Sequence, residues 1–248
     1  MKYYLYMIFF TIIFTNSFHY GEKKEITEQE LRRKYKMLLE NIQDWPNLKK
    51  YSQENEAVKK QENSGERIIF MGNSITEEWK RLSSDFFLNE NFINRGIGGQ
   101  TSPQMLIRFR QDVVDLSPKG VVILCGTNDI AGNTGPSTIE MIENNIQSMS
   151  EIAASNGISV YLCSVLPVYD YPWAPGLEPA EKITNLNQWI KNYAQEKNHV
   201  YIDYHTPMKD EKNGLKKEFS EDGVHPNSKG YKIMEKIVLE HLQSLKQD

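Results

Sequence analysis

The chain has 248 residues, and its 33 acidic and 29 basic side chains give a formal net charge of −4. This balance argues against a nucleic-acid-binding protein, because such proteins usually attract phosphates with an excess of Lys and Arg. Hydrophobic residues make up 39% of the chain, and only two cysteines are present. That composition is typical of a globular protein without a disulfide scaffold, and we expect one domain of roughly 200 residues with an appendage.

The first 20 residues are typical of a secretory signal peptide. Lys2 precedes an apolar run from Tyr3 to Phe14, and polar residues 15–17 follow it. The twelve residues of this run are too few to span about 30 Å of hydrocarbon as a helix, so a stable membrane anchor is the weaker alternative. No Cys follows the run, which argues against a lipid anchor. We predict a signal peptide at residues 1–20 and export to the periplasm or beyond the cell.

Residues 21–65 predict a helical extension and a connector. Thr27 and Glu30 form a capping-box pattern that would begin a helix, and Trp45-Pro46 would end it. We expect the apolar face of this helix to dock on the main domain; its members are Leu31, Tyr35, Leu38, Leu39 and Ile42. The highly charged run from Glu54 to Glu66 is interpreted as a solvated connector.

Residues 66–248 predict an α/β domain. Short apolar runs indicate five strands, at residues 67–71, 91–94, 120–125, 159–165 and 199–203. Amphipathic stretches between and after them indicate helices, the last near the C-terminus. Because the strands are almost wholly apolar, we expect a mostly parallel five-stranded sheet covered by helices on both faces, a three-layer αβα sandwich. Ligands of such sheets bind beyond the carboxyl ends of the strands.

Ser74 follows the first predicted strand, in the sequence Gly72-Asn73-Ser74-Ile75-Thr76. A serine at a strand-to-helix turn exposes its hydroxyl near the positive end of a helix, which suits a nucleophile. The alternative is that Ser74 only caps the helix. The G-x-S-x-G motif of the α/β-hydrolases is absent, because position 76 is Thr.

Two further loops could supply hydrogen-bond donors. Gly96, Gly98 and Gly99 follow the second strand and would let backbone N–H groups approach a ligand closely. The competing interpretation, a phosphate-binding loop, lacks the Gly-Lys-Ser/Thr sequence. Asn128 follows the third strand and could offer its amide to a developing oxyanion, although an Asx turn would explain it equally well.

Asp222 and His225 lie in one loop before the last helix. A carboxylate three residues before a histidine can accept its ring N–H and leave the other nitrogen free as a base. The alternatives are a helix-capping loop and a metal pair with His205 or Asp203, but no zinc-ligand spacing is present. Together the four segments supply a nucleophile, a base, an orienting acid and oxyanion donors.

At these residues the chain resembles the SGNH hydrolases, also called the GDSL esterase/lipase family, from Arg67 to about Leu245. Four blocks occur in the family's order, at residues 72–75, 96–99, 126–129 and 222–225. The Asp of the family's Gly-Asp-Ser start is replaced here by Asn73.

The resemblance implies the flavodoxin-like SGNH fold and a role for each residue. Ser74 would be the nucleophile, His225 the general base and acid, and Asp222 its orienting carboxylate. The oxyanion hole would consist of the backbone N–H groups of Ser74 and Gly99 and the side chain of Asn128. The implied reaction is ester hydrolysis through an acyl-enzyme, with no metal or organic cofactor.

The glycine and Asn128 blocks look most like those of platelet-activating-factor acetylhydrolase-like and carbohydrate acetylesterase members. Asn73, Tyr171 and Trp173 are the candidate substrate-contacting residues; the two aromatic rings could stack on a sugar or pack against the N-terminal helix. We therefore expect a small-molecule or glycan ester, with acetyl removed from a glycan as the first hypothesis. A lipid acylhydrolase or thioesterase and a non-catalytic carbohydrate-binding protein are the alternatives.

Overall fold

The computed structural model describes residues 27–62 and 65–242. The predicted signal peptide lies outside these residues. Helix α1 (Glu28–Gln43) begins at the predicted capping box, in which the Thr27 N–H donates to Glu30 at 2.9 Å and the Glu30 N–H donates to the Thr27 hydroxyl at 3.2 Å. Residues from Asn41 onward form a compact unit of their own.

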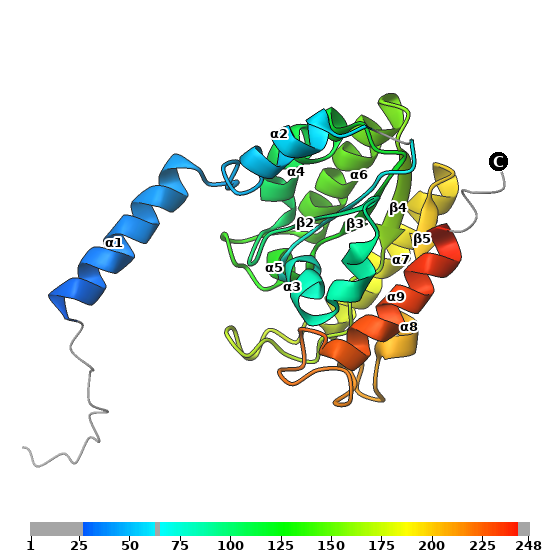
Figure 1. Cartoon of the computed structure of the whole chain (residues 1–248). Coiled ribbons are helices and arrows are strands. Elements are labelled where there is room, and N and C mark those ends of the chain that lie inside the picture. The colour runs from blue at the N-terminus through cyan, green and yellow to red at the C-terminus, as the bar shows by residue number, and fades with distance from the viewer. Residues whose placement is uncertain (1–26, 63–64, 243–248) are drawn as a thin grey trace, which may run out of the picture. The chain divides into compact units, whose positions relative to one another are not determined.

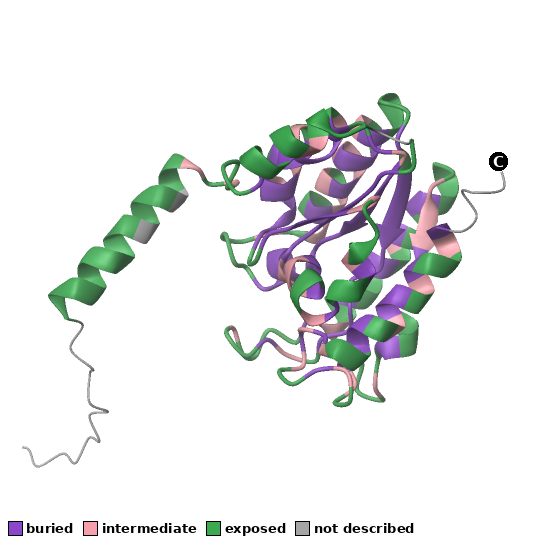
Figure 2. Cartoon of the chain, in the orientation of Figure 1, coloured by how far each residue is buried: buried purple, intermediate pink, exposed green. Residues whose placement is uncertain are grey.

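A five-stranded, all-parallel sheet organises this unit (Figure 1). Its spatial order is β2-β1-β3-β4-β5, the order of flavodoxin-like folds. The five predicted strands are confirmed, with ends shifted by at most two residues: β1 is Ile68–Gly72, β2 Phe92–Gly96, β3 Gly120–Leu124, β4 Ser159–Cys163 and β5 Val200–Ile202. Figure 2 shows the strands buried between layers of helix.

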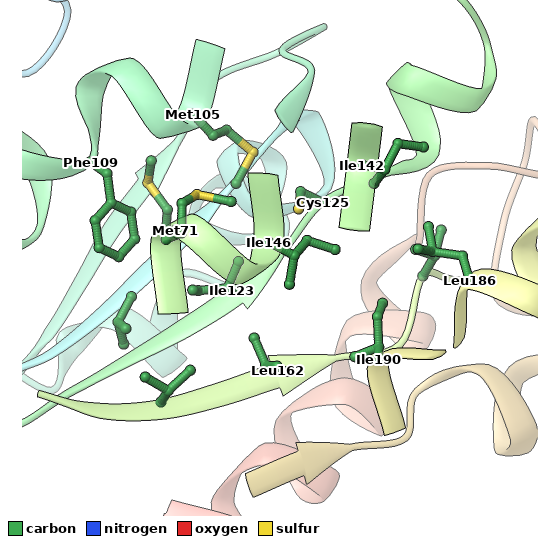
Figure 3. Close-up of a cluster of buried hydrophobic side chains, with 14 of the residues drawn as sticks. Met71, Met105, Phe109, Ile123, Cys125, Ile142, Ile146, Leu162, Leu186 and Ile190 are labelled. Atoms are coloured by element: carbon green, nitrogen blue, oxygen red, sulfur yellow. The ribbon is translucent and has the colours of Figure 1, made fainter. Parts of the chain in front are cut away.

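Helices cover both faces of the sheet, as its apolar strands predict. Ile69 and Met71 face one core, which helices α4 (Ser102–Asp112), α6 (Ile139–Ser155) and α7 (Ala180–Glu196) close (Figure 3). Ile68 and Phe70 point to the opposite core, beneath α3 (Ser74–Leu82) and α9 (Ser228–Leu242), because successive side chains of a strand alternate between faces. The helices and helical turns of this unit are α2 (Ser52–Lys60), α3 (Ser74–Leu82), η1 (Ser84–Leu88), α4 (Ser102–Asp112), η2 (Val114–Leu116), α5 (Thr127–Ile130), α6 (Ile139–Ser155), α7 (Ala180–Glu196), α8 (His205–Met208) and α9 (Ser228–Leu242).

The interpretation of residues 54–66 as a solvated connector is wrong for its first half. Helix α2 occupies residues 52–60, and its Asn55 is buried. The Asn55 amide donates to Asp112 at 2.6 Å, and its oxygen accepts from Arg95 Nε at 2.9 Å. These contacts join α2 to α4 and β2, so the packed part of the chain begins well before residue 66.

Within the described residues, no helix is both long and apolar enough to cross a bilayer.

Candidate active site

The site lies at the carboxyl edge of the sheet. Ser74 follows β1, the glycine turn at residues 96–99 follows β2, and Asn128 follows β3. Since these strands are neighbours, their carboxyl ends meet at one edge, where parallel α/β sheets bind ligands.

Ser74 meets His225 across 151 positions of sequence: its Oγ lies 2.9 Å from His225 Nε2. Ser74 is the first residue of α3, but it is not the cap. The cap is Asn73, whose side-chain oxygen accepts the Ile75 N–H at 3.1 Å. The Ser74 hydroxyl is therefore left for His225, and the interpretation of Ser74 as a helix cap is wrong.

Asp222 orients His225. Its Oδ2 lies 2.7 Å from His225 Nδ1, while its Oδ1 accepts the backbone N–H groups of Val224 and His225 at 2.9 and 2.8 Å. Burial acts to raise the pKa of the Asp222 carboxyl, but the hydrogen bonds from His225 and Val224 outweigh it and lower that pKa to about 2. An ionised Asp222 holds the ring proton on Nδ1, so Nε2 can accept the proton of Ser74.

The glycine turn lies directly beside Ser74. A Cβ atom added at Gly98 would lie 3.9 Å from Ser74 Cβ, and Gly99 has a φ of +74°. That backbone conformation favours glycine, and it is found at the residue whose N–H the resemblance assigns to the oxyanion hole.

Asn128 supplies a side-chain amide at the same carboxyl edge of the sheet. It is buried and donates to Gln100 O at 2.9 Å, so the side chain reaches a second loop rather than closing a turn of its own. An Asn amide carries two hydrogens, and one remains for a ligand.

Asp129 fixes the backbone around Asn128. Its buried carboxylate accepts the Ser102 N–H at 2.9 Å and the Ser102 hydroxyl at 2.5 Å. Burial raises the pKa of Asp129. These bonds hold the start of α4 against α5, and thereby hold the oxyanion candidate in place.

Two cavities flank the glycine turn. The larger, of about 650 Å³, is lined by Ser74, Gly98, Asp222 and His225 together with residues of α3 and of the loop before α9. The smaller, of about 360 Å³, is lined by Gly98, Gly99, Gln100 and by Trp45, Gln104, Asn133 and Thr134. Both volumes are in the range of small-molecule sites. Trp45 was missed at the sequence level because no motif marks it.

Trp173 is an aromatic residue beside His225. Its side chain is 45% exposed, and its ring centroid lies 6.1 Å from that of His225. The indole N–H donates to Asn133 at 3.0 Å, which fixes the ring beside the site.

Tyr171 and Asn73 were predicted to contact substrate, but both side chains are buried. Tyr171 is fully buried, where its hydroxyl bonds Thr127 at 3.0 Å and its ring supports Trp173 at 5.2 Å. Asn73 is only 1% exposed, and its side-chain oxygen caps α3.

In the part of the chain that the structure describes, no group of three His, Cys, Asp or Glu side chains is placed to hold a metal ion. His205 is buried, and burial lowers its pKa.

Residues 70–233 match the model of the GDSL-like lipase/acylhydrolase family. The chain belongs to this family. A GDSL-like lipase from Bacteroides thetaiotaomicron is 43% identical, and the superposition covers 81% of this chain and 98% of that one with a TM-score of 0.78. The predicted SGNH fold and the predicted family are thereby confirmed.

More distant structural neighbours have the same fold. A Streptococcus pneumonia protein described as a candidate platelet activating factor is 25% identical, covering 85% of this chain and 99% of that one with a TM-score of 0.69. An acetylxylan esterase from Geobacillus stearothermophilus has the same fold, at 18% identity, 73% and 95% coverage and a TM-score of 0.59.

Curated relatives match over shorter stretches. A lipoprotein of Bacillus subtilis is 35% identical over 86 residues, 33% of this chain and 35% of that protein. A multidomain esterase of Ruminococcus flavefaciens is 29% identical over 130 residues, 51% of this chain and 16% of the esterase. The chain thus corresponds to only a minor part of either relative.

Proposed function

We propose that the protein is a serine esterase that hydrolyses short-chain esters, acetyl esters foremost, through an acyl-enzyme on Ser74. The observation that carries this proposal is the continuous contact from Ser74 Oγ to His225 Nε2 and from His225 Nδ1 to Asp222. A hydroxyl, an imidazole and an ionised carboxylate in this order are the groups that nucleophilic acyl transfer needs.

In the proposed reaction, Ser74 Oγ attacks the ester carbonyl while its proton passes to His225 Nε2. The N–H groups of Ser74 and Gly99 and the free amide hydrogen of Asn128 stabilise the resulting oxyanion. The imidazolium returns its proton to the leaving alcohol, and the acyl group stays on Ser74. Water, deprotonated by His225, then releases the acid and restores the hydroxyl.

Asn128→Ala is expected to lower kcat by roughly 10²- to 10³-fold, because it removes one oxyanion donor. KM should change little, since the bond strengthens mainly in the transition state. Steady-state kinetics on p-nitrophenyl acetate measure both constants, and a thermal unfolding scan checks that losing the bond to Gln100 has not unfolded the loop. An unchanged kcat would show that Asn128 has only a structural role.

We propose a glycan as the alcohol part of the natural ester. His225 must protonate the leaving alcohol, so the alcohol lies on the His225 side, where the exposed ring of Trp173 is fixed. A half-exposed, rigid indole offers an apolar face to a sugar ring and keeps a polar edge. The polar lining of the neighbouring cavity, including Gln104 and Thr134, suits hydroxyl groups better than a long acyl chain.

Trp173→Ala is expected to raise KM for an acetylated xylo-oligosaccharide by about tenfold, the scale of one lost aromatic contact. Hydrolysis of p-nitrophenyl acetate, which carries no sugar, should stay within about twofold. Tyr169→Ala is the matched control, because Tyr169 is an exposed aromatic in the same loop that borders a different cavity. Equal losses on both substrates would refute the sugar contact.

The substrate class is tested by incubating the purified protein with acetylated glycans, phospholipids and p-nitrophenyl esters of increasing chain length, and measuring the acid released. Acetate from glycans supports the proposal. Rates that rise beyond about eight carbons would favour a lipid or thioester substrate, since each buried CH₂ adds about 0.8 kcal/mol. No release from any ester would favour a binding protein that retains the fold.

We also propose that the protein is exported. The support is the apolar N-terminal run and a lipoprotein among its relatives. N-terminal sequencing of the protein from the producing cells should find residues 1–20 removed; an intact Met1 on the mature protein would refute export by this route.

A further inference from the structure

A segment that precedes the family match is built into the active site. Pro46 O accepts the Gln100 side-chain N–H at 2.7 Å, and the Tyr51 hydroxyl donates to Gly96 O. Between them Lys50 pairs with Glu77 of α3. The family match begins at residue 70, so these contacts join a segment outside the matched residues to the loop that carries Gly98 and Gly99.

Glu77 joins three parts of the site. It lies one helical turn after Ser74, its Oε2 accepts the Gly98 N–H at 2.6 Å, and its Oε1 pairs with Lys50. Glu77 and Lys50 are each about one-third exposed. A backbone N–H bonded to a carboxylate is a charge-assisted hydrogen bond, shorter and stronger than one to a neutral acceptor.

The glycine turn needs such a tether. Neither Gly98 nor Gly99 has a side chain to pack, and both are exposed. The turn's other backbone bonds lie at its ends, where the Ile97 N–H donates to Gly72 O at 3.1 Å and the Gln100 N–H donates to Ile97 O at 3.3 Å. The Asn133 amide also donates to Gly99 O, at a longer distance of 3.4 Å. At the centre of the turn, the short bond from Gly98 to Glu77 ties the backbone to the helix that begins with the nucleophile.

We propose that Glu77 is a positioning residue of the esterase reaction, which holds the Gly98–Gly99 turn against Ser74, and that Lys50 orients its carboxylate. The two carboxylate oxygens of Glu77 bond Lys50 and the Gly98 N–H, and not Ser74 or His225. It sets the distance between Ser74 and the Gly99 N–H, and misplacing an oxyanion donor lowers the rate of the chemical step without weakening ground-state binding. This inference rests on the proposed function.

Three substitutions separate the contributions of the Glu77 oxygen, the Glu77 charge and the Lys50 partner. Glu77→Gln keeps an oxygen for the Gly98 N–H and loses the charge, Glu77→Ala loses both, and Lys50→Met loses only the partner. Glu66→Ala is the matched control: Glu66 also pairs with a lysine, Lys119, but it precedes β1 at the opposite edge of the sheet. Partly exposed ion pairs contribute little to stability, so all four variants should fold.

The readouts are kcat and KM on p-nitrophenyl acetate, inhibition by a short trifluoromethyl ketone, whose adduct with Ser74 carries an oxyanion, and deuterium uptake by the peptide covering residues 96–101. We expect Glu77→Ala to lower kcat about 10- to 100-fold, less than outright loss of a donor, with KM within about twofold. Inhibition by the ketone should weaken by a similar factor, and deuterium uptake by the peptide covering residues 96–101 should accelerate.

Glu77→Gln should stay within about fivefold of the parent, Lys50→Met should fall between the two Glu77 variants, and Glu66→Ala should match the parent in every readout. Wild-type kcat in Glu77→Ala would overturn the inference, as would equal losses in Glu77→Gln and Glu77→Ala or unchanged deuterium uptake. A parent protein with no activity on any ester refutes the proposed function and this inference together, whereas an active parent with an unaffected Glu77→Ala variant refutes the inference alone.

Discussion

Ser74→Ala is expected to lower kcat on p-nitrophenyl acetate by roughly five to six orders of magnitude, the loss typical of removing a serine nucleophile. Folding should be unaffected. The Ser74 hydroxyl bonds His225, and the N-cap of α3 is Asn73, so the substitution removes no helix cap. The thermal unfolding midpoint should therefore equal that of the parent.

Kinetics and unfolding have to be measured on the same preparations. Ser148→Ala is the matched control, because Ser148 is a partly exposed serine whose hydroxyl donates to a carbonyl of its own helix α6. It should retain full activity. Hydrolysis by the Ser74 variant at the parent's rate would assign the nucleophile elsewhere.

Asp222→Asn is expected to lower kcat by about 10⁴-fold with the fold intact. The asparagine oxygen can still accept the N–H groups of Val224 and His225, so the loop keeps its shape. Its NH₂ group, however, would face His225 Nδ1 and favour the ring tautomer with the proton on Nε2. That tautomer cannot accept the proton of Ser74.

The pKa of Asp222 sets the pH range of this effect. Because that pKa is lowered to about 2, the parent carboxylate is ionised at every pH from about 5 to 8, and the loss should appear across that whole range. Asp210→Asn is the matched control, since Asp210 also accepts backbone N–H groups in a tight turn, those of Lys212 and Gly214. A loss below tenfold for Asp222→Asn would show that His225 needs no orienting carboxylate.

The sheet and the main site residues could be predicted because their signals are local. Each strand is a short apolar run, and alternation with amphipathic stretches implies parallel order. A parallel sheet then brings the loops after β1, β2 and β3 to one edge without any knowledge of contacts. For this reason Ser74 and Asn128 could be assigned to one site, with His225 joined to them by the family's block order.

The contacts that depend on distant partners could not be predicted. Helix α2 carries mostly polar, exposed side chains, and its buried Asn55 bonds Arg95 and Asp112, which lie far away in the sequence. The loop bearing Tyr171 and Trp173 has no regular period, so nothing in its sequence tells which ring faces inward. The role proposed for Glu77 depends on Lys50 and Gly98, which approach it only in the folded chain.

The most direct test of the account is to identify the residue that a fluorophosphonate modifies. Such reagents phosphonylate a serine whose hydroxyl a neighbouring base has activated. Mass spectrometry of the parent protein should find one adduct, on the peptide containing Ser74, and Asp222→Asn should form it far more slowly. An adduct on a different residue, or none in a preparation that still hydrolyses esters, would contradict the assignment of Ser74, His225 and Asp222 as the catalytic unit.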